Sequence, residues 1–403
     1  MSGLTAETVR VVNGLTARWA RTATRGTVLS AAGVWPLLAF LADGAGGAAR
    51  AELTAALGSA ADQAATRAGE LLAGMEAMPG VESALGLWTD RALELREEWR
   101  AGLPAEVHGV LTHDLEASQE ALNAWAAKRT GGLIERMPVT LTEDARMVLA
   151  TALVLRTDWP RPFTEVMRRP AAGPWQGRTL LGLHRRGVRP DRIGVADTPE
   201  GHVTVLKVPG DNGLDVHLLL GEERMAPGPV LRTAVDVLAG ALPVVAGGRL
   251  PYGQAGPGLT VERQPSMTPE PVTLDVTTMA FDVRADHDLL ALHRLFGLTT
   301  ARDTGQGHFP GISGAPLAVG AAGQSAVAQF GALGFRAAAV SAVMPVAAGS
   351  GPPQYPYETT VVRAVFDRPF GFVAVHRETR LVLATGWVAE ATPYDARTRA
   401  GGW

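Results

Sequence analysis

The sequence predicts an α+β fold, because helix-like patterns fill its first part and strand-like patterns its second. In Leu29–Leu41 and Ala48–Leu57, apolar residues recur at helical spacing on either side of a glycine-rich turn, Gly44–Gly47. Later, His202–Val208 and Leu214–Leu220 flank the segment Pro-Gly-Asp-Asn-Gly, and Asn-Gly between two apolar runs is a strong hairpin signal.

The chain is predicted to form one domain that covers residues 1–403. Hydrophobic residues make up 46% of it and charged residues 19%, which is enough for a sizeable core. This length would ordinarily suggest two domains. The tracts Pro251–Gly258 and Gly349–Pro356 are nevertheless interpreted as loops within one domain, because the strands on either side of them must pair.

The remaining elements follow from local patterns. Val148–Leu155 is a largely apolar run of strand length, which is typical of a strand buried on both faces. Gly131-Gly132 follows a helical pattern and marks its end. The other predicted elements are strands at Val81–Trp88 and Val272–Val283, and helices at Leu93–Ala101, Ala117–Arg129 and Asp288–Gly297. Ser325–Val343 and Val361–Thr385 complete the predicted β content.

Composition and charge exclude several functions. The formal net charge is −3, so nothing favours nucleic acid or an anionic membrane surface as a partner. Cysteine is absent, which excludes disulfides and thiolate chemistry. Met1–Arg25 has no continuous apolar core of signal-peptide type, so we expect a cytoplasmic protein; a secreted one would need a leader outside this sequence. Lys128 and Lys207 are the only lysines, and this arginine bias, with the alanine and glycine richness, predicts a high-GC bacterial source.

Two polar clusters are weighed against ordinary structural roles. His287 and His293 do not have the spacing of a zincin motif, so no metal site is predicted. Arg185-Arg186, with Arg189 and Arg192, forms a basic patch that could bind a polyanion. A solvated loop is the favoured interpretation of that patch.

The stretch Gly331–Phe370 has the composition of a loop that must sometimes be buried. Its small residues, Ala337–Val343, follow Gly334-Phe335-Arg336 and precede a tract with turn chemistry, Pro345–Pro356. A segment with so little side-chain bulk can enter between two strands without overpacking the core beneath them. The chain then returns to a strand-like pattern at Thr359–Ala364.

Blocks of residues along nearly the whole chain match the motifs of one family. Leu122-Asn123-Ala124-Trp125 and Thr130–Ile134 are similar to its Ile-Asn-x-Trp-Val and Thr-x-Gly-x-Ile motifs, and Trp159–Phe163 is similar to Trp-x-x-Pro-Phe. His308–Gly314 is similar to Asp-Phe-Ser-Gly-Ile-Ser, and Phe366–Gly386 looks like the last two strands. With the loop, these blocks follow the family order, and the chain resembles a serpin.

The resemblance implies a single-domain serpin fold of mixed sheets and packed helices, with an exposed reactive-centre loop. It also implies a suicide inhibitor and not an enzyme. A serine protease attacks a bait bond and becomes acylated, and the cut loop then inserts as an extra strand of the main sheet before hydrolysis is complete. The expected partner is therefore a serine protease. No cofactor is expected, and we expect a monomer.

The hinge that begins the loop departs from the family pattern of Glu-Glu-Gly-Thr-Glu followed by alanines. The matching residues are Gly334, Phe335, Arg336, Ala337, Ala338, Ala339, Val340 and Ser341. Phe335 stands where the family has a small residue that turns inward, and a ring forced into a packed seam would cost about 1–3 kcal/mol or more unless a hollow awaits it. Pro345 would lack the N–H that a central strand needs. These departures favour an alternative, a non-inhibitory serpin that binds or scaffolds another molecule or serves biosynthesis. They also predict that cleavage of the loop stabilises only a Phe335→Thr variant.

The resemblance also implies a hydrogen-bonded gate beneath the main sheet. By alignment the chain keeps Ser30 and has Gly33, Thr151 and Gln324 at the other gate positions. Thr151 and Gln324 can still form hydrogen bonds, so we expect a changed gate that still works. Trp159 matches the family tryptophan at the top of the sheet.

The position of the bait bond stays open, because the loop is longer than usual. Counting forward from Gly334 by the family spacing places the bond at Ala348-Gly349, and counting back from Phe366 places it at Glu358-Thr359. Tyr355 and Tyr357 lie between these two estimates. A small bait residue suits an elastase- or subtilisin-like protease, tyrosine a chymotrypsin-like one, and glutamate a glutamyl-specific one.

Overall fold

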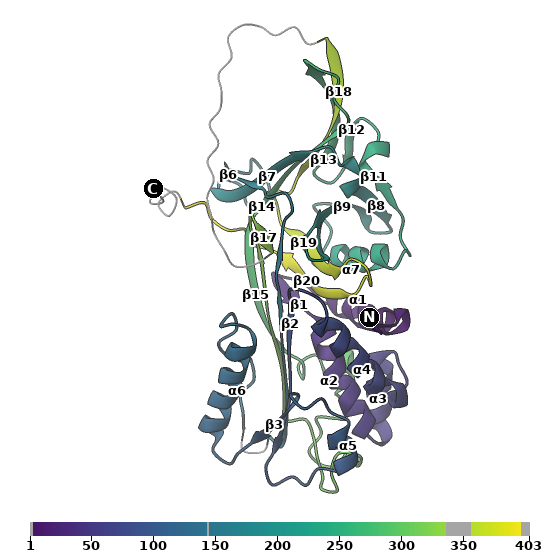
Figure 1. Ribbon diagram of the computed structural model, residues 1–403, viewed down its shortest axis with the longest axis vertical. Helices are drawn as coiled ribbons and strands as arrows, with labels where there is room; N and C mark the ends of the chain where they lie inside the picture. The colour runs from purple at the N-terminus through teal and green to yellow at the C-terminus, as the bar shows by residue number, and fades with distance from the viewer. Residues whose placement is uncertain (1–2, 143–144, 336–355, 396–403) are drawn as a thin grey trace.

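The computed structural model describes residues 3–142, 145–335 and 356–395 (Figure 1). The predicted hinge positions from Arg336 to Ser341, Pro345, the candidate bond Ala348-Gly349 and Tyr355 lie outside the described residues. Among those described, the chain combines helices with three larger β-sheets and one sheet of two short strands. The predicted α+β class is therefore confirmed.

The main sheet has five strands in the order β15 (Phe281–Asp288), β16 (Ala321–Phe330), β4 (Met147–Leu155), β2 (Val81–Asp90) and β3 (His108–Leu111). Every residue of β4 is buried, as the apolar run predicts. The β16 and β4 strands are parallel, and their ladder runs from the pair Ala321–Val148 to the pair Ala326–Leu153. Because β16 continues to Phe330, its last residues extend beyond this ladder.

Helices cover both faces of the main sheet (Figure 1). The helices α2 (Ala31–Gly44), α3 (Gly47–Leu57) and α4 (Ala61–Glu76) lie on one face, and α6 (Leu115–Arg129) lies on the other. The predicted helix at Leu29–Leu41 is confirmed, but it begins later, because Ser30 is extended and caps it.

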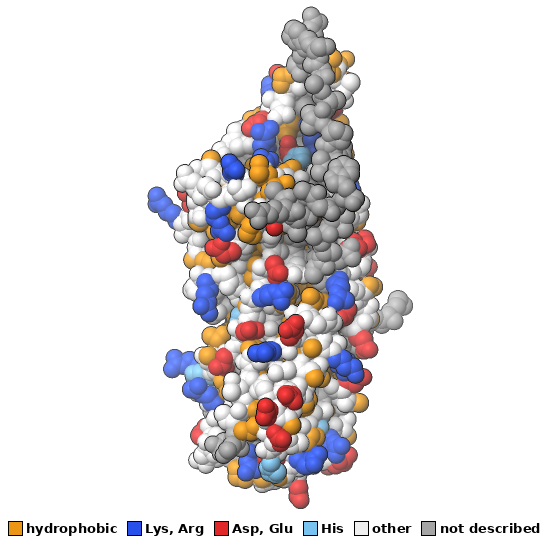
Figure 2. Space-filling model, turned by 90° about the vertical axis from the view of Figure 1, so that its left-hand side faces the viewer, with side chains coloured by type: hydrophobic (Ala, Val, Ile, Leu, Met, Phe, Trp, Pro, Cys, Tyr) orange, Lys and Arg blue, Asp and Glu red, His pale blue; other side chains and the backbone are white. Residues whose placement is uncertain are grey.

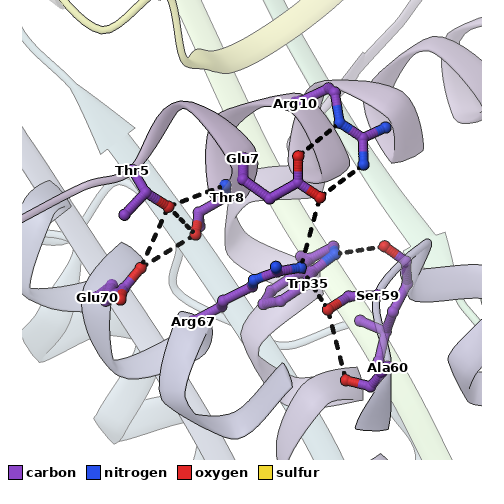
Figure 3. Close-up of polar contacts among 10 residues, drawn as sticks. Thr5, Glu7, Thr8, Arg10, Trp35, Ser59, Ala60, Arg67 and Glu70 are labelled. Carbon is purple, nitrogen blue, oxygen red and sulfur yellow. Dashed lines mark hydrogen bonds and ion pairs between the residues drawn. The ribbon is translucent and has the colours of Figure 1, made fainter. Parts of the chain in front are cut away.

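The first helix, α1 (Ala6–Ala20), is joined to α4 by polar contacts (Figure 3). Thr8 Oγ1 donates a hydrogen bond of 3.1 Å to Glu70 of α4. Arg67, also on α4, lies 3.8 Å from Glu7 and donates to Ser59 Oγ at 2.7 Å. These contacts fix α1 over the helices that cover the main sheet.

A second sheet has seven strands among the described residues, packed with α1 and α7 (Pro227–Leu238). Its centre includes the predicted hairpin, which is confirmed as β9 (Gly201–Pro209) and β10 (Leu214–Gly221). Its strand order is β1 (Thr27–Leu29), β20 (Val382–Val388), β19 (Phe370–His376), β10, β9, β8 (Ile193–Thr198) and β11 (Val244–Ala246).

The third sheet contains a hairpin that the sequence does not predict. The tract Pro251–Gly258, expected to be a loop, holds strand β12 (Gly253–Gly256), which pairs with β13 (Leu259–Ser266). Gly258, at φ +60°, supplies the turn between them. The order of the six strands is β12, β13, β18 (Tyr357–Val365), β14 (Thr273–Met279), β7 (Leu180–Gly187) and β6 (Thr164–Arg168). The hairpin therefore makes β18 an interior strand, at the top of Figure 1.

Three predicted elements differ in extent. The helix expected at Leu93–Ala101 is reduced to α5 (Glu97–Ala101), and that expected at Asp288–Gly297 to α8 (His293–Phe296), because β15 continues through Asp288. The strand expected at Val272–Val283 is divided into β14 and β15, which belong to different sheets. The short elements β5 (Thr157–Asp158), β17 (Gly334–Phe335), η1 (Pro190–Arg192) and η2 (Gly247–Arg249) complete the described chain.

None of the described helices has the length and apolar character needed to cross a membrane. On the face shown in Figure 2, acidic and basic side chains are interspersed over the lower and middle parts. Such a mixture produces no extended field of one sign over these parts.

Candidate functional site

The hinge begins where the main sheet opens. After β16 the chain turns, with a hydrogen bond of 3.0 Å from Gly331 N to Gly334 O. Strand β17 then pairs antiparallel with β5, matching Gly334 with Asp158 and Phe335 with Thr157. A Cβ atom at Gly334 would lie 2.3 Å from Thr157 O, so only glycine allows this approach. Since β5 follows β4 directly, the hinge starts beside the strand next to which a cut loop would insert.

The Phe335 side chain is only 2% exposed. Its ring lies 6.0 Å from that of Phe372 on β19, and Phe372 stacks on Phe281 at 5.0 Å. Phe281 in turn stacks on Phe330 at 5.4 Å. In the uncut chain the ring therefore fills a hollow in an aromatic cluster that neighbouring strands supply.

Trp159 fastens the turn before the hinge. Its indole Nε1 donates to Gly331 O at 2.9 Å, and its backbone N–H donates to Leu333 O at 2.8 Å. Phe163 N donates to Ala332 O at 2.8 Å, so the segment 159–163 holds three consecutive carbonyls. The structure thus places Trp159 at the top of the sheet, against the hinge.

Beneath the sheet, the structure brings Ser30 and Gln324 together. Gln324 accepts a hydrogen bond from Ser30 N through Oε1 and donates to Ser30 O through Nε2, both at 2.8 Å. Ser30 Oγ donates to Leu383 O of β20 at 2.6 Å and accepts from Gly33 N at 3.2 Å. This buried network joins β16, α2 and β20. The family alignment predicts Ser30 and Gln324 as members of this network. It does not predict Leu383, because Leu383 takes part through its backbone carbonyl and its side chain gives no indication of this role.

Thr151 and Gly33 form the second contact of this region. Thr151 Oγ1 donates to Gly33 O at 3.1 Å, and a Cβ atom at Gly33 would lie 2.8 Å from that hydroxyl. Glycine therefore lets α2 approach β4 closely. The four residues predicted to form the gate are adjacent, in the order Ser30, Gln324, Gly33 and Thr151.

Replacement of Gln324 by leucine is expected to lower the free energy of unfolding by about 2–4 kcal/mol, because it leaves the buried Ser30 N–H and C=O without partners. Gln329→Leu is the matched control, since Gln329 lies on the same strand and bonds the exposed Asp282. Denaturant unfolding should show a loss below about 0.5 kcal/mol for the control. If Gln324→Leu and Gln329→Leu lower the free energy of unfolding equally, the buried network does not stabilise the fold more than an exposed hydrogen bond does.

Strand β18 contains part of the candidate bait region. Tyr357, Glu358 and Thr359 pair with Ser266, Pro265 and Gln264 of β13. Thr359 is only 4% exposed, and its hydroxyl donates to the carbonyls of Glu270 and Pro271. The alternatives Tyr357 and Glu358-Thr359 therefore lie in a strand whose pairing is lengthened by the unpredicted β12–β13 hairpin, and a protease would reach a bond there only after this end of the pairing opened.

The turn between β9 and β10 contacts β5, and a buried carboxylate, Asp215, lies on the strand that follows this turn. Asp211, in the turn between β9 and β10, accepts from Asp158 N at 3.3 Å and donates through its own N–H to Asp158 O at 3.0 Å. Asp215, 1% exposed, pairs with Arg377 at 2.7 Å and Lys207 at 2.9 Å. Burial opposes its ionisation, but these two cations outweigh burial and hold the Asp215 pKa below its usual value.

Beside this pair, burial and the neighbouring Lys207 lower the pKa of His217 to about 4. The unfolded chain, whose histidines titrate near 6.5, therefore takes up this proton first as pH falls. Stability is expected to fall between about pH 6.5 and pH 4, by up to about 3 kcal/mol from this residue. His217→Gln should flatten part of the pH dependence of unfolding, and His113→Gln, at an exposed site, should not. Identical profiles for His217→Gln and the wild type would contradict this assignment.

These features define a class of protein: a helix-covered sheet that is open at one end and carries a hinge beside the opening. Comparisons with known proteins identify the class. Residues 8–171 match the family model described as Serpin (serine protease inhibitor). A rice protein (Oryza sativa subsp. japonica), Putative serpin-Z8, is 32% identical over 178 residues, which cover 40% of this chain and 42% of the relative. The sequence match thus spans less than half of that relative.

The solved structures extend the likeness to nearly the whole chain. Human thyroxine-binding globulin in complex with thyroxine aligns with a TM-score of 0.71 and 15% identity, over 97% of this chain and 100% of that one. Serpin48 of the insect Tenebrio molitor aligns with a TM-score of 0.69 and 16% identity, over 96% and 98%. The described chain therefore has the fold of the serpins, and its first part also matches the serpin family model in sequence.

Proposed function

We propose that this protein inhibits a serine protease by offering the segment between β17 and β18 as bait. The observation that supports this proposal is the pairing of the start of the hinge with β5. Gly334 and Phe335 already pair with β5, so the residues that follow start at the opening between β4 and β16. Once the bait bond is cut, the chain can continue from this start as a new strand. Of the candidates for the bond, Ala348-Gly349 and Tyr355 are favoured, because Tyr357 and Glu358-Thr359 are paired in β18.

A covalent complex tests the proposal. The protein should be incubated with elastase-, subtilisin- and chymotrypsin-like proteases and then run on denaturing gels. A band near the summed mass of protein and protease, less the segment after the cut bond, is expected with at least one of them, because the trapped acyl bond survives denaturation while that segment is released. Each protease with its serine blocked is the control and should give no band. Mass spectrometry of the released peptide would identify the bait bond.

Phe335 itself favours a second candidate function. Its buried ring is an anchor that can hold the hinge at this position and stop further insertion. The protein would then be a non-inhibitory serpin that binds another molecule, as thyroxine-binding globulin binds thyroxine. Cleavage by every protease that attacks the loop, without a covalent band, would favour this candidate and count against inhibition.

A further inference from the structure

A narrow pocket beside the hinge, with a volume of about 20 Å³, is lined by cations. They come from the end of β7, the turn after it, the segment behind β5, and β9, while apolar residues of β9 and β14 complete the lining. The cationic members, here called the arginine pocket, are Arg161, Arg185, Arg186, Arg189, Arg192 and Lys207.

Three carboxylates neutralise part of this charge. The ion pairs are Arg189–Asp191 at 2.8 Å, Lys207–Asp215 at 2.9 Å and Arg186–Glu270 at 3.6 Å. Asp215 also pairs with Arg377, so its charge is shared between two cations. Within the described parts of the chain, no carboxylate forms an ion pair with Arg161, Arg185 or Arg192. The arginine pocket therefore keeps an excess of positive charge.

Arg185 is the innermost of these cations. It shares one face of β7 with the buried Leu183, and its guanidinium lies 4.1 Å from the centre of the Phe163 ring. Its Nη1 donates to Arg161 O at 2.8 Å. Burial, together with the nearby Arg192 and Arg161, lowers the Arg185 pKa to about 10. A half-buried guanidinium among like charges is costly, and a bound anion would offset that cost.

We propose that the arginine pocket binds an oxyanion, namely a phosphate or sulfate group. Guanidinium groups offer paired N–H donors in a planar fork that matches the spacing of two oxygens on such a group. Arg161, Arg185 and Arg192 form no ion pair with a carboxylate of the described residues, and they line the pocket from three separate segments. The proposal concerns binding alone and does not depend on inhibitory activity.

The position of the pocket gives binding a consequence for the hinge. Arg161 lies between Trp159 and Phe163, whose backbone N–H groups hold Leu333 O and Ala332 O. An oxyanion that joins Arg161 to Arg185 would fasten the segment 159–163 to β7. Slower hydrogen exchange at the amides of Trp159 and Phe163 is therefore expected when the pocket is occupied.

Isothermal titration at constant ionic strength tests the site, with inorganic phosphate and sulfate as probes and chloride as the balancing anion. The pocket variant is Arg161→Ala/Arg192→Ala, which removes two arginines that form no ion pairs. The matched control is Arg294→Ala/Arg302→Ala, which removes two exposed arginines near α8, away from the pocket. We expect saturable binding of one phosphate by wild type and control, and a Kd at least tenfold weaker in the pocket variant.

A long-chain polyphosphate distinguishes the sources of the group. If polyphosphate binds with the same affinity per phosphate as inorganic phosphate, the pocket is assigned to a free anion. If polyphosphate binds much more tightly and the pocket variant loses this gain, the pocket is assigned to a polyanion. Either result supports the site. Absence of saturable binding to wild type, or equal affinity in all three proteins, would overturn it. Thermal unfolding of the three proteins without added anion verifies that both variants are folded.

Discussion

Cleavage of the chain between Phe335 and Tyr357 is expected to raise the melting temperature by about 10–20 °C. Insertion of the cut segment would replace the ladder between β4 and β16 with two ladders, one on each side of the new strand. Each net backbone hydrogen bond contributes about 1 kcal/mol, and a large domain gains about 2 °C for each kcal/mol. Thermal unfolding of intact and cleaved protein measures the difference.

This expectation reverses the one drawn from the sequence, in which only Phe335→Thr would respond to cleavage. In the uncut chain the Phe335 ring is already buried against Phe372, so insertion of the residues after it need not force this ring into the seam if Phe335 stays in place. Cleavage should therefore raise the melting temperature of the wild type, and it should raise that of Phe335→Thr by no more than this amount. An unchanged or lower melting temperature of the cleaved wild type would contradict insertion and support the non-inhibitory candidate.

Uncut protein is the first control for this experiment. Strand β18 is held by eight register pairs with β13 and by five with β14, so the uncut chain cannot supply a new strand without breaking them. Prolonged incubation should leave its melting temperature unchanged. Ala338→Pro is the second control, because proline lacks a ladder N–H and should prevent the rise after cleavage.

Local patterns predicted the elements that depend on local chemistry. The apolar run of β4 and the Asn-Gly hairpin between β9 and β10 follow directly from residue order. Helix α7 was not predicted from the sequence. Its buried residues Val230, Leu231, Ala234 and Leu238 recur at helical spacing, and this periodicity could have predicted it.

Non-local contacts decide what the sequence could not predict. The strand β13 contains Glu262, Arg263 and Gln264, which do not suggest a buried partner, and it is fixed only by pairing with β18, far along the chain. The fit of Phe335 likewise depends on Phe372, which lies on a strand of another sheet. The gate residues were found because the family alignment supplied that non-local information.

Replacement of Phe335 by alanine is expected to lower the free energy of unfolding by about 3 kcal/mol. The substitution removes a ring that is 2% exposed and leaves a cavity beside Phe372. Without this anchor, β17 keeps its backbone contacts, which are the pairing with β5 and the hydrogen bond from Gly331 N to Gly334 O. Denaturant unfolding measures the loss, and hydrogen exchange at the amides of Trp159 and Phe163 measures release of the hinge, because these amides hold Leu333 O and Ala332 O.

Phe366→Ala is the matched control for this experiment, since Phe366 is also fully buried but its ring contacts Phe370, whereas the ring of Phe335 contacts Phe372. It should lose comparable stability but leave exchange at Trp159 and Phe163 close to the wild-type rate when both are compared under strongly native conditions. Phe335→Leu should fall between wild type and Phe335→Ala, because it refills part of the cavity. If Phe335→Ala and Phe366→Ala accelerate exchange at these two amides equally, the ring does not anchor the hinge, and the hinge is held by the backbone contacts of Gly331–Leu333 alone.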